Sequence, residues 1–181
     1  MKFKETEIRG VYVIEPEIHV DQRGYFMETY NENEFLRNGL NYVFVQDNQS
    51  ESSKGVLRGL HFQKKFPQAK LVRVLRGEVF DVAVDLRKGS PTYGKWTGIV
   101  LSEANRKMFL IPRGFAHGFL VLSDKAVFSY KCDAFYHPED EGGILYSDPD
   151  VGVIWPIQEN ELILSEKDKK HPTLKESRTE F

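Results

Sequence analysis

Residues 107–122 read Lys-Met-Phe-Leu-Ile-Pro-Arg-Gly-Phe-Ala-His-Gly-Phe-Leu-Val-Leu. Two apolar runs, Lys107–Ile111 and Gly118–Leu122, lie on either side of the turn residues Pro112-Arg113-Gly114. Short apolar runs bounded by proline and glycine are typical of β-strands, whereas an amphipathic helix would need a longer apolar pattern with a 3.6-residue period. The stretch therefore predicts two strands joined by a tight turn.

The same pattern recurs along most of the chain. Further strands are predicted at Val11–Glu15, Gly24–Tyr30, Tyr42–Ser50, Val56–Gln63, Ala69–Leu75, Glu78–Leu86, Thr97–Leu101 and Ala126–Tyr136. Arg76-Gly77 and Ser123-Asp124 read as additional tight turns, which favours an antiparallel meander or a Greek key. An aromatic content of 13% suits pleated, half-buried surfaces. We expect an all-β sandwich, jelly roll or barrel.

Helical pattern is confined to two short pieces. Asn31–Glu34 followed by Gly39 predicts a capped helix, and Ser165–Asp168 opens a second one. The polar tail 169–181 is expected to be loosely ordered. At 181 residues, against roughly 150 per domain, residues 1–181 are expected to form a single domain with short flanking helices.

Charge and cysteine content exclude several classes of protein. A net charge of −2 leaves no basic field for nucleic acid. The lone Cys132 cannot form an internal disulfide, and the N-terminal residues contain no apolar signal stretch, so a cytoplasmic location is expected. No run of the sequence is long and apolar enough to predict a membrane span.

Some predicted strands have one polar face. Asp81 and Asp85 alternate with apolar residues along their strand, so they lie on the opposite face from those residues. We expect that face to be the solvated outer face. Arg58 alternates with its neighbours in the same way. The strands that contain His61 and Tyr130 are expected to form the inner wall of a barrel mouth, where polar groups converge on a ligand.

The sequence lacks the motifs of common cofactor sites, and two of its histidines are candidates for a function. Neither a dinucleotide fingerprint, a phosphate-binding loop, C-x-x-C nor H-E-x-x-H occurs. His19, His137 and His171 lie in turns or in the tail and are interpreted as structural or surface residues. His61 and His117 lie within predicted strands or beside them, and they remain as candidate functional histidines.

The segment around His117 resembles the P-x-G-x-x-H motif of the cupin superfamily, whose fold is a small jelly-roll barrel. Metal-binding cupins add H-x-H and a following glutamate. Here Gln63 replaces the second histidine, and the glutamate region reads Phe66-Pro67-Gln68. Two imidazoles without a carboxylate are a poor site for a divalent ion, so neither a metal nor another cofactor is expected.

Seven strings, the His117 segment among them, occur in a fixed order: Asp21-x-Arg23-Gly24-x-Phe26-x-Glu28, Gln46-Asp47-Asn48-x-Ser50, Arg58–Gln63, Lys70, Pro112–Phe119, Tyr130-Lys131 with Tyr136-x-Pro138-Glu139-x-Glu141, and Asp148-Pro149. Together they resemble the dTDP-4-dehydrorhamnose 3,5-epimerase family from about Ile8 to Asp168.

The resemblance implies a metal-free cupin homodimer that exchanges strands between its subunits. Its activity would be inversion of C3 and C5 of dTDP-4-dehydro-6-deoxy-D-glucose to give dTDP-4-dehydro-L-rhamnose, in dTDP-rhamnose biosynthesis. Both carbons flank the C4 ketone, so loss of either proton gives an enolate. Inversion then needs a base on one face of the sugar and an acid on the other.

The resemblance also assigns catalytic roles. His61 matches the base, and an imidazole suits proton transfer near neutral pH. Asp168 matches the carboxylate that orients it, although Ser165-x-x-Asp168 is also a capping box. Lys70 matches the cation that stabilises the enolate oxygen, with an exposed strand-edge lysine as the alternative. Tyr130 matches the acid on the opposite face, with plain packing as the alternative.

Substrate binding is expected to rely on local contacts. Arg23 and Arg58 can bracket the pyrophosphate through paired guanidinium hydrogen bonds, and Tyr136 is a candidate to stack on thymine. By the resemblance, His117 lies beside the sugar or phosphates. The remaining assignments from the resemblance are Glu28, Gln46, Asp47 and Asn48 at the nucleoside end and Glu141 and Lys167 at the pocket rim.

Three alternatives stay open at this point. One is an epimerase that inverts only C3 or C5 of a related dTDP-4-keto-deoxysugar, and Phe62, where some relatives have tyrosine, leaves that selectivity undecided. Another is a noncatalytic sugar-binding jelly roll, which should lack the acid on the second face. The third is a metal-dependent cupin, which needs ligands that the motifs do not supply.

Overall fold

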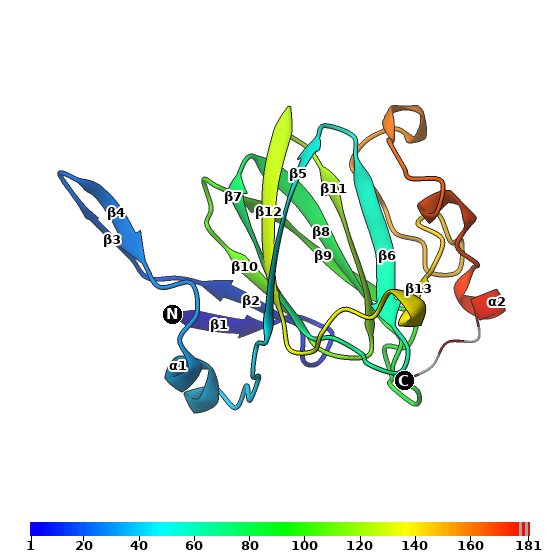
Figure 1. Cartoon of the computed structure of the whole chain (residues 1–181), viewed down its shortest axis with the longest axis horizontal. Coiled ribbons are helices and arrows are strands. Elements are labelled where there is room, and N and C mark those ends of the chain that lie inside the picture. The colour runs from blue at the N-terminus through cyan, green and yellow to red at the C-terminus, as the bar shows by residue number, and fades with distance from the viewer. Residues whose placement is uncertain (178, 180) are drawn as a thin grey trace.

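The computed structural model, which describes residues 1–177, 179 and 181, consists mainly of two antiparallel sheets packed face to face (Figure 1). The six-stranded sheet has the order β1-β2-β10-β7-β12-β5 and the five-stranded sheet the order β13-β6-β11-β8-β9. This is a cupin-like jelly roll, as predicted. The strands of the first sheet are β1 (Lys2–Glu5), β2 (Tyr12–Glu15), β5 (Gln46–Ser53), β7 (Lys70–Arg76), β10 (Met108–Ile111) and β12 (Lys125–Cys132). Those of the second are β6 (Leu57–Gln63), β8 (Glu78–Asp85), β9 (Trp96–Ser102), β11 (Phe115–Val121) and β13 (Glu141–Gly143).

Every predicted strand overlaps an observed one, but the predicted meander is wrong. From β5 to β13 the chain passes from one sheet to the other at each step, except between β8 and β9, which pair directly. The turns at Arg76-Gly77, Pro112–Gly114 and Ser123-Asp124 therefore join strands of different sheets. Turn residues specify a chain reversal, not the sheet to which the next strand belongs.

The apolar core lies between the sheets and includes Val72, Val79, Phe109, Phe119 and Phe128, all of them buried. Burying each such side chain stabilises the fold by roughly 1.5–3 kcal/mol. Polar side chains line a cavity between the same two sheets.

The expected solvated face of β8 is wrong, because Asp81 and Asp85 are both fully buried. The alternate residues Val82 and Val84 belong to a second apolar cluster that also contains Leu174 of the C-terminal segment. The five-stranded sheet is thus covered on both faces, so the acidic positions of β8 point into the barrel. A two-residue period cannot reveal which face is solvated when neither is.

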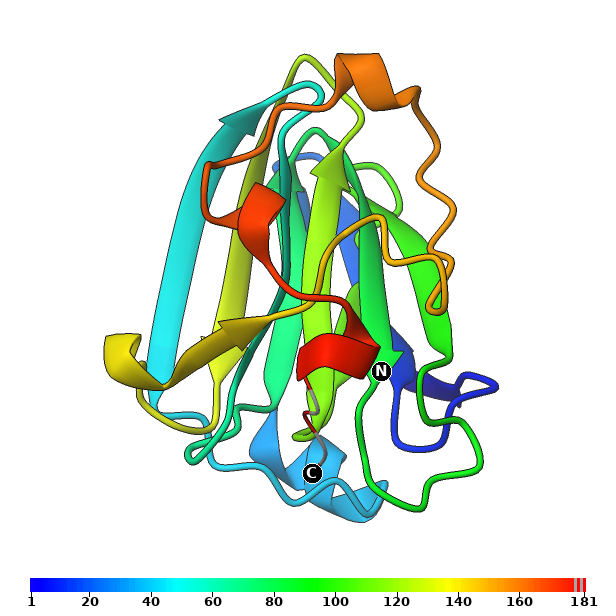
Figure 2. The ribbon, with the colours of Figure 1, turned by 90° about the vertical axis from the view of Figure 1, so that its right-hand side faces the viewer.

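The tail is not loosely ordered where the structure describes it. It contains a 3₁₀ turn, η3 (Asp168–Lys170), and a short helix, α2 (Leu174–Ser177), which lie across the five-stranded sheet (Figure 2). Leu174 is buried and donates its backbone N–H to Asp148. The helix predicted after Ser165 is only the turn η3, whose Asp168 N–H donates to Ser165 Oγ.

The first helix is confirmed as α1 (Glu32–Arg37), with the Asn31 side chain accepting from Asn33 and Glu34 N–H. Phe35 of this helix covers the outer face of the six-stranded sheet. Two further 3₁₀ turns are η1 (Pro138–Asp140) and η2 (Glu159–Glu161). None of the helices in the described part of the chain is long and apolar enough to cross a membrane.

A separate hairpin, β3 (Ile18–Asp21) and β4 (Gly24–Met27), projects away from the barrel (Figure 1). Its apolar side chains have little cover: Val20 is 75% exposed and Phe26 66% exposed. Such a hairpin buries too little surface to be stable by itself in water.

Candidate active site

A cavity of about 570 Å³ opens at one end of the barrel between the two sheets. It contains most of the polar residues singled out from the sequence, and it confirms that His61 and Tyr130 lie on an inner wall. The lining includes Arg58, His61, Lys70, His117, Tyr130, Tyr136, Glu141, Lys167 and Asp168.

Strict alternation along β6 would place Arg58 and His61 on opposite faces, yet both line the cavity. The reason is a register shift against β11: His61 pairs with His117, but Arg58 pairs with Phe119. Gly59, at φ +140°, lies against Gly118 so closely that a Cβ would come within 2.5 Å of the Gly118 Cα. The two glycines permit the irregularity that turns both polar side chains inward.

His61 and Asp168 form a short contact on the cavity wall. His61 Nε2 lies 2.6 Å from Asp168 Oδ1, and His61 Nδ1 lies 4.0 Å from Glu141 Oε1. Burial acts to raise the pKa of Asp168, but the hydrogen bond and charge of His61 outweigh it, so this pKa lies below its usual value. An ionised Asp168 accepts from Nε2–H, which leaves Nδ1 as the nitrogen with a free lone pair. The two roles considered for Asp168 are compatible. Its backbone N–H donates to Ser165 Oγ in the turn, while its carboxylate faces His61.

Lys70 and Tyr130 come from the neighbouring strands β7 and β12, and Lys70 Nζ lies 6.0 Å from the centre of the Tyr130 ring. Strand β7 is flanked by β10 and β12, so the interpretation of Lys70 as an exposed strand-edge lysine is wrong. Burial lowers the pKa of Lys70 and raises the pKa of Tyr130. The phenol therefore keeps its proton over the physiological range and can act as an acid.

His117 has a partner that the sequence did not reveal. Its Nε2 lies 2.9 and 3.1 Å from the two carboxylate oxygens of Asp81 on the adjacent strand β8. Burial raises the pKa of Asp81 and lowers that of His117, so it disfavours the charged form of each. Asp81 thereby fixes the orientation of the His117 ring in the cavity wall.

The cavity rim is a polar cluster around Glu141. Tyr136 Oη donates to Glu141 Oε2 over 2.8 Å, and Lys167 Nζ donates to the same oxygen over 2.5 Å. Burial acts to raise the pKa of Glu141, but these two hydrogen bonds lower it on balance. Gln46 Oε1 accepts from the Tyr136 backbone N–H, which places Gln46 next to the rim.

Five predicted binding residues do not line the cavity: Gln46, which only adjoins its rim, and Arg23, Glu28, Asp47 and Asn48. Asp47 pairs with Lys131, and Asn48, opposite Tyr130 in the ladder, donates to Cys132 Sγ. Arg23 lies at the projecting hairpin and pairs with Asp21, while Glu28 accepts from Asn31.

The positions that carry ligands in metal cupins do not fit a metal here. Gln63 is committed to backbone groups, because it donates to the carbonyls of Phe66 and Phe135 and accepts from His137 N–H. Gln68 donates to the carbonyl of Ala134. The two histidine positions that remain are both paired with carboxylates, His117 with Asp81 and His61 with Asp168.

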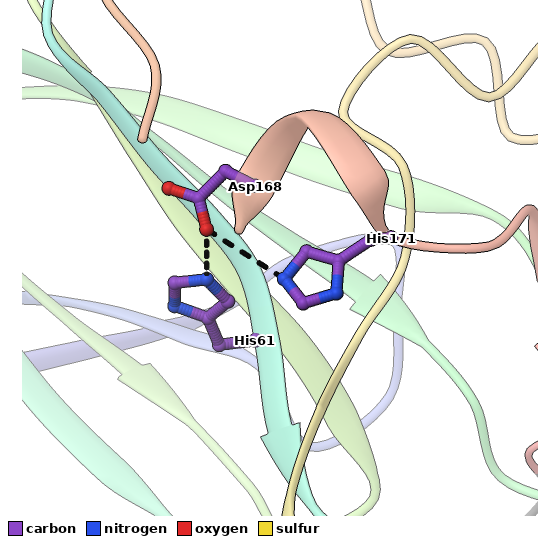
Figure 3. Close-up of side chains that lie close together, drawn as sticks. All are labelled: His61, Asp168 and His171. Atoms are coloured by element: carbon purple, nitrogen blue, oxygen red, sulfur yellow. Dashed lines mark hydrogen bonds and ion pairs between the residues drawn. The ribbon is translucent and has the colours of Figure 1, made fainter. Parts of the chain in front are cut away.

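His171, which the sequence led us to interpret as a structural or surface residue, lies beside His61 and Asp168. The His171 ring lies 5.4 Å from the His61 ring, and its Nε2 lies 3.6 Å from Asp168 Oδ1 (Figure 3). It packs over Gly143, where a Cβ would come within 2.5 Å of the ring. The pairing of β13 with β6 sets Gly143 opposite His61, and no local motif encodes this arrangement.

Fold and cavity together define a cupin-type jelly roll with an imidazole–carboxylate pair, a lysine and a tyrosine on the wall of one pocket. The model of the family described as dTDP-4-dehydrorhamnose 3,5-epimerase matches residues 5–176. A curated protein of that name from Methanothermobacter thermautotrophicus is 58% identical over 177 residues, which cover 97% of this chain and 96% of the relative.

Solved structures agree with the sequence match. The crystal structure of dTDP-4-dehydrorhamnose 3,5-epimerase from Elizabethkingia anophelis superposes with a TM-score of 0.94 at 56% identity and covers 97% of both chains. A dTDP-6-deoxy-D-glucose-3,5-epimerase from Legionella pneumophila, in complex with dTDP-4-keto-L-rhamnose, gives 0.93 at 50% identity, covering 96% of this chain and 93% of the other. The chain belongs to the dTDP-4-dehydrorhamnose 3,5-epimerase family.

Proposed function

We propose that this cavity binds dTDP-4-dehydro-6-deoxy-D-glucose and inverts its C3 and C5 to give dTDP-4-dehydro-L-rhamnose. The observation that carries the proposal is the 2.6 Å His61–Asp168 pair in one cavity with Lys70 and Tyr130. A base, a cation and a protonated phenol around one pocket are the groups that inversion next to a ketone requires. The related Legionella enzyme in complex with dTDP-4-keto-L-rhamnose supports the substrate class.

The same two-stage chemistry serves each carbon. His61 Nδ1 takes the proton, and the electrons of the C–H bond move to the C4 oxygen, where Lys70 stabilises the enolate charge. Asp168 stabilises the imidazolium through Nε2–H. Tyr130 then donates its phenolic proton to the opposite face of the same carbon. Solvent removes the proton from His61 and returns one to Tyr130, so the enzyme is restored.

The nucleotide is held by local contacts. Arg58 binds the pyrophosphate, Tyr136 stacks on thymine, and His117 lies beside the sugar or phosphates. Glu141 and Lys167 complete the rim, with Gln46, Asp47 and Asn48 at the nucleoside end. We place the reaction in the cytoplasm, where Cys132, buried and free, needs no oxidising environment.

Arg23 and Glu28 belong to this site only if a second copy supplies them. Arg23 does not line the cavity of its own chain, and the hairpin beside it leaves Val20, Tyr25 and Phe26 exposed. We propose a strand-exchanged homodimer in which this hairpin packs on the partner, so that Arg23 and Glu28 of the partner subunit reach the nucleotide. Burial of the three apolar side chains then stabilises the dimer.

Proton NMR in heavy water with dTDP-4-keto-6-deoxyglucose tests the reaction directly. Loss of both the C3 and C5 proton signals, with appearance of the inverted product, is the expected result. Exchange at only one carbon would instead indicate an epimerase acting at one position. A protein that binds the nucleotide sugar without any exchange would be a noncatalytic binding module.

Activity is expected to survive exhaustive chelation, because the proposed proton transfers use only protein side chains. The measurement compares turnover before and after dialysis against a strong chelator, with the metal content of both samples determined. Turnover that disappears on chelation and returns with a divalent ion would contradict the mechanism.

Arg58→Ala and Arg23→Ala are each expected to weaken dTDP binding by about 1.5–3 kcal/mol, the size of a charged hydrogen bond. Arg58 Nε donates to Ser52 Oγ, a minor contact, so the barrel should keep its stability. Calorimetric titration with dTDP measures the affinity, and thermal unfolding of the same samples checks the fold. Unchanged affinity in both variants would remove the two arginines from the site.

The rate is expected to fall on the alkaline side at a lower pH than an ordinary lysine would give. The Lys70 ammonium exists below its pKa, and burial lowers that pKa, so the charge that stabilises the enolate is lost early as pH rises. Tyr130 loses its proton later, because burial raises its pKa. Lys70→Arg, whose guanidinium stays charged, should move the alkaline limb of kcat to higher pH. An unmoved limb would show that another group titrates.

A further inference from the structure

Among the described residues, one set of three side chains offers metal-ligating atoms within mutual reach: His61, Asp168 and His171, whose atoms lie within 4.8 Å of one another. Asp168 Oδ1 is central, at 2.6 Å from His61 Nε2 and 3.6 Å from His171 Nε2 (Figure 3). Ligand atoms around a tetrahedral zinc ion with bonds of about 2.0–2.2 Å lie roughly 3.3 Å apart. Small side-chain shifts would therefore seat an ion among the three.

His171 provides the second observation. Its side chain is only 9% exposed, and its Nε2 is buried without a hydrogen-bond partner. Buried polar atoms usually have a partner, and one without it calls for an explanation such as an ion. The ring cannot easily turn away, because it packs directly over Gly143. A lone pair on Nε2 is thus held close to the carboxylate.

We propose that His61, Asp168 and His171 form a binding site for a divalent transition-metal ion, zinc above all, and that occupancy of this site inhibits the enzyme. Two imidazole nitrogens and one carboxylate oxygen are a donor set that suits zinc, with water from the cavity in the fourth position. The site shares only His61 with the ligand positions of metal cupins, since Gln63, Gln68 and His117 take no part in it.

Inhibition follows from the tautomer of His61, and this part of the proposal rests on the proposed function. A neutral imidazole has one N–H and one lone pair. A metal on Nε2 uses the lone pair there, so the proton that Nε2 carried toward Asp168 must reside on Nδ1. Glu141 Oε1, 4.0 Å from Nδ1, favours that proton. The nitrogen that should accept the substrate proton then has no lone pair available.

The step balances without any redox partner. The zinc ion gains bonds to His61 Nε2, His171 Nε2 and Asp168 Oδ1, and the proton leaves His61 Nε2 as one arrives from solvent at Nδ1. No net proton is released, and the carboxylate supplies the only formal negative charge. Protonation of either imidazole competes with the ion, as for other histidine sites.

Binding is tested on the full chain without nucleotide, because the substrate pyrophosphate would itself bind zinc. Calorimetric titration of the chelator-treated enzyme with Zn²⁺ is expected to give one site per chain. His171→Leu should weaken zinc at least about 10- to 100-fold, the range reported for loss of a supporting ligand interaction. Asp168→Asn should do the same. His137→Asn removes a histidine outside this set, whose ring stacks on Phe66 and pairs with Glu139, and it serves as the matched control with unchanged zinc affinity.

Inhibition is tested by deuterium exchange into substrate at fixed, buffered free Zn²⁺. The wild-type enzyme and His137→Asn should lose exchange as the site fills, whereas His171→Leu should exchange at close to its zinc-free rate. His171→Asn gives a second variant in case the leucine impairs folding. A chelator should restore the inhibited wild-type enzyme fully.

The outcomes separate this proposal from the proposed function. Equal zinc affinity in wild-type, His171→Leu and His171→Asn proteins would overturn the site. Zinc binding that needs His171 but leaves exchange unchanged would overturn the inhibition. An enzyme inactive in metal-free buffer, but with a zinc site that depends on His171, would contradict the proposed function while the site stands.

Discussion

Tyr130→Phe is expected to exchange deuterium from heavy water into the substrate while yielding little inverted product. The variant keeps His61 as the base, so the enolate still forms. Without the phenol, the enolate is reprotonated by His61 from the original face, and the configuration is retained. General acid contributions are typically about 100- to 10,000-fold, so inversion should fall by that range while exchange persists. Proton NMR measures both in one sample.

His61→Asn is the matching variant, and it should abolish exchange and inversion together. The contrast matters more than either rate, because a damaged fold would depress exchange in both variants. Full epimerisation by Tyr130→Phe would mean that water or another residue is the acid. Normal exchange by His61→Asn would overturn the assignment of the base.

The second large effect is expected from Asp168→Asn. The 2.6 Å contact of Asp168 with His61 Nε2 selects the tautomer that leaves Nδ1 unprotonated. An amide is neutral and can donate to Nε2, which favours the opposite tautomer. The loss of kcat should be roughly 100- to 10,000-fold, with dTDP affinity nearly unchanged because Asp168 does not hold the pyrophosphate.

Asp124→Asn, in the exposed turn before β12, is the control for loss of a carboxylate far from the cavity, and it should behave as wild type. A drop in dTDP affinity that accounts for the whole effect of Asp168→Asn would assign this residue to binding. Wild-type kcat would mean that Asp168 is only the partner of Ser165 in the turn.

The sequence predicted where strands lie but not how they pair. Apolar runs between turn residues, such as Lys107–Ile111 before Pro112, predicted every strand that is longer than four residues. The strands β1 (Lys2–Glu5), β3 (Ile18–Asp21) and β13 (Glu141–Gly143) were missed, because each is short and contains charged residues or glycine in place of an apolar run. Pairing depends on contacts between distant residues, and a local pattern does not contain it.

Candidate residues that a family motif names were correctly expected to lie near one another, whereas neighbours that depend only on three-dimensional packing were missed. His61, Lys70, Tyr130 and Asp168 meet in one cavity, as the motifs implied. Asp81 was assigned to solvent because the cover over the outer face of its sheet comes from Leu174, far along the chain. Hydrophobic periodicity could not have corrected this, since both faces of β8 are buried.

The alternation of successive strands between the two sheets also bears on how the chain folds. Strand β5 (46–53) pairs with β12 (125–132), so roughly seventy intervening residues must be arranged before that ladder closes. The entropic cost of closing the loop between β5 and β12 has to be overcome before these pairings contribute stability. Refolding is therefore expected on a scale of about milliseconds to seconds rather than microseconds. During synthesis, the polar wall of the cavity cannot form until β12 has left the ribosome, so an incomplete chain exposes β5 and β7 as unpaired edges.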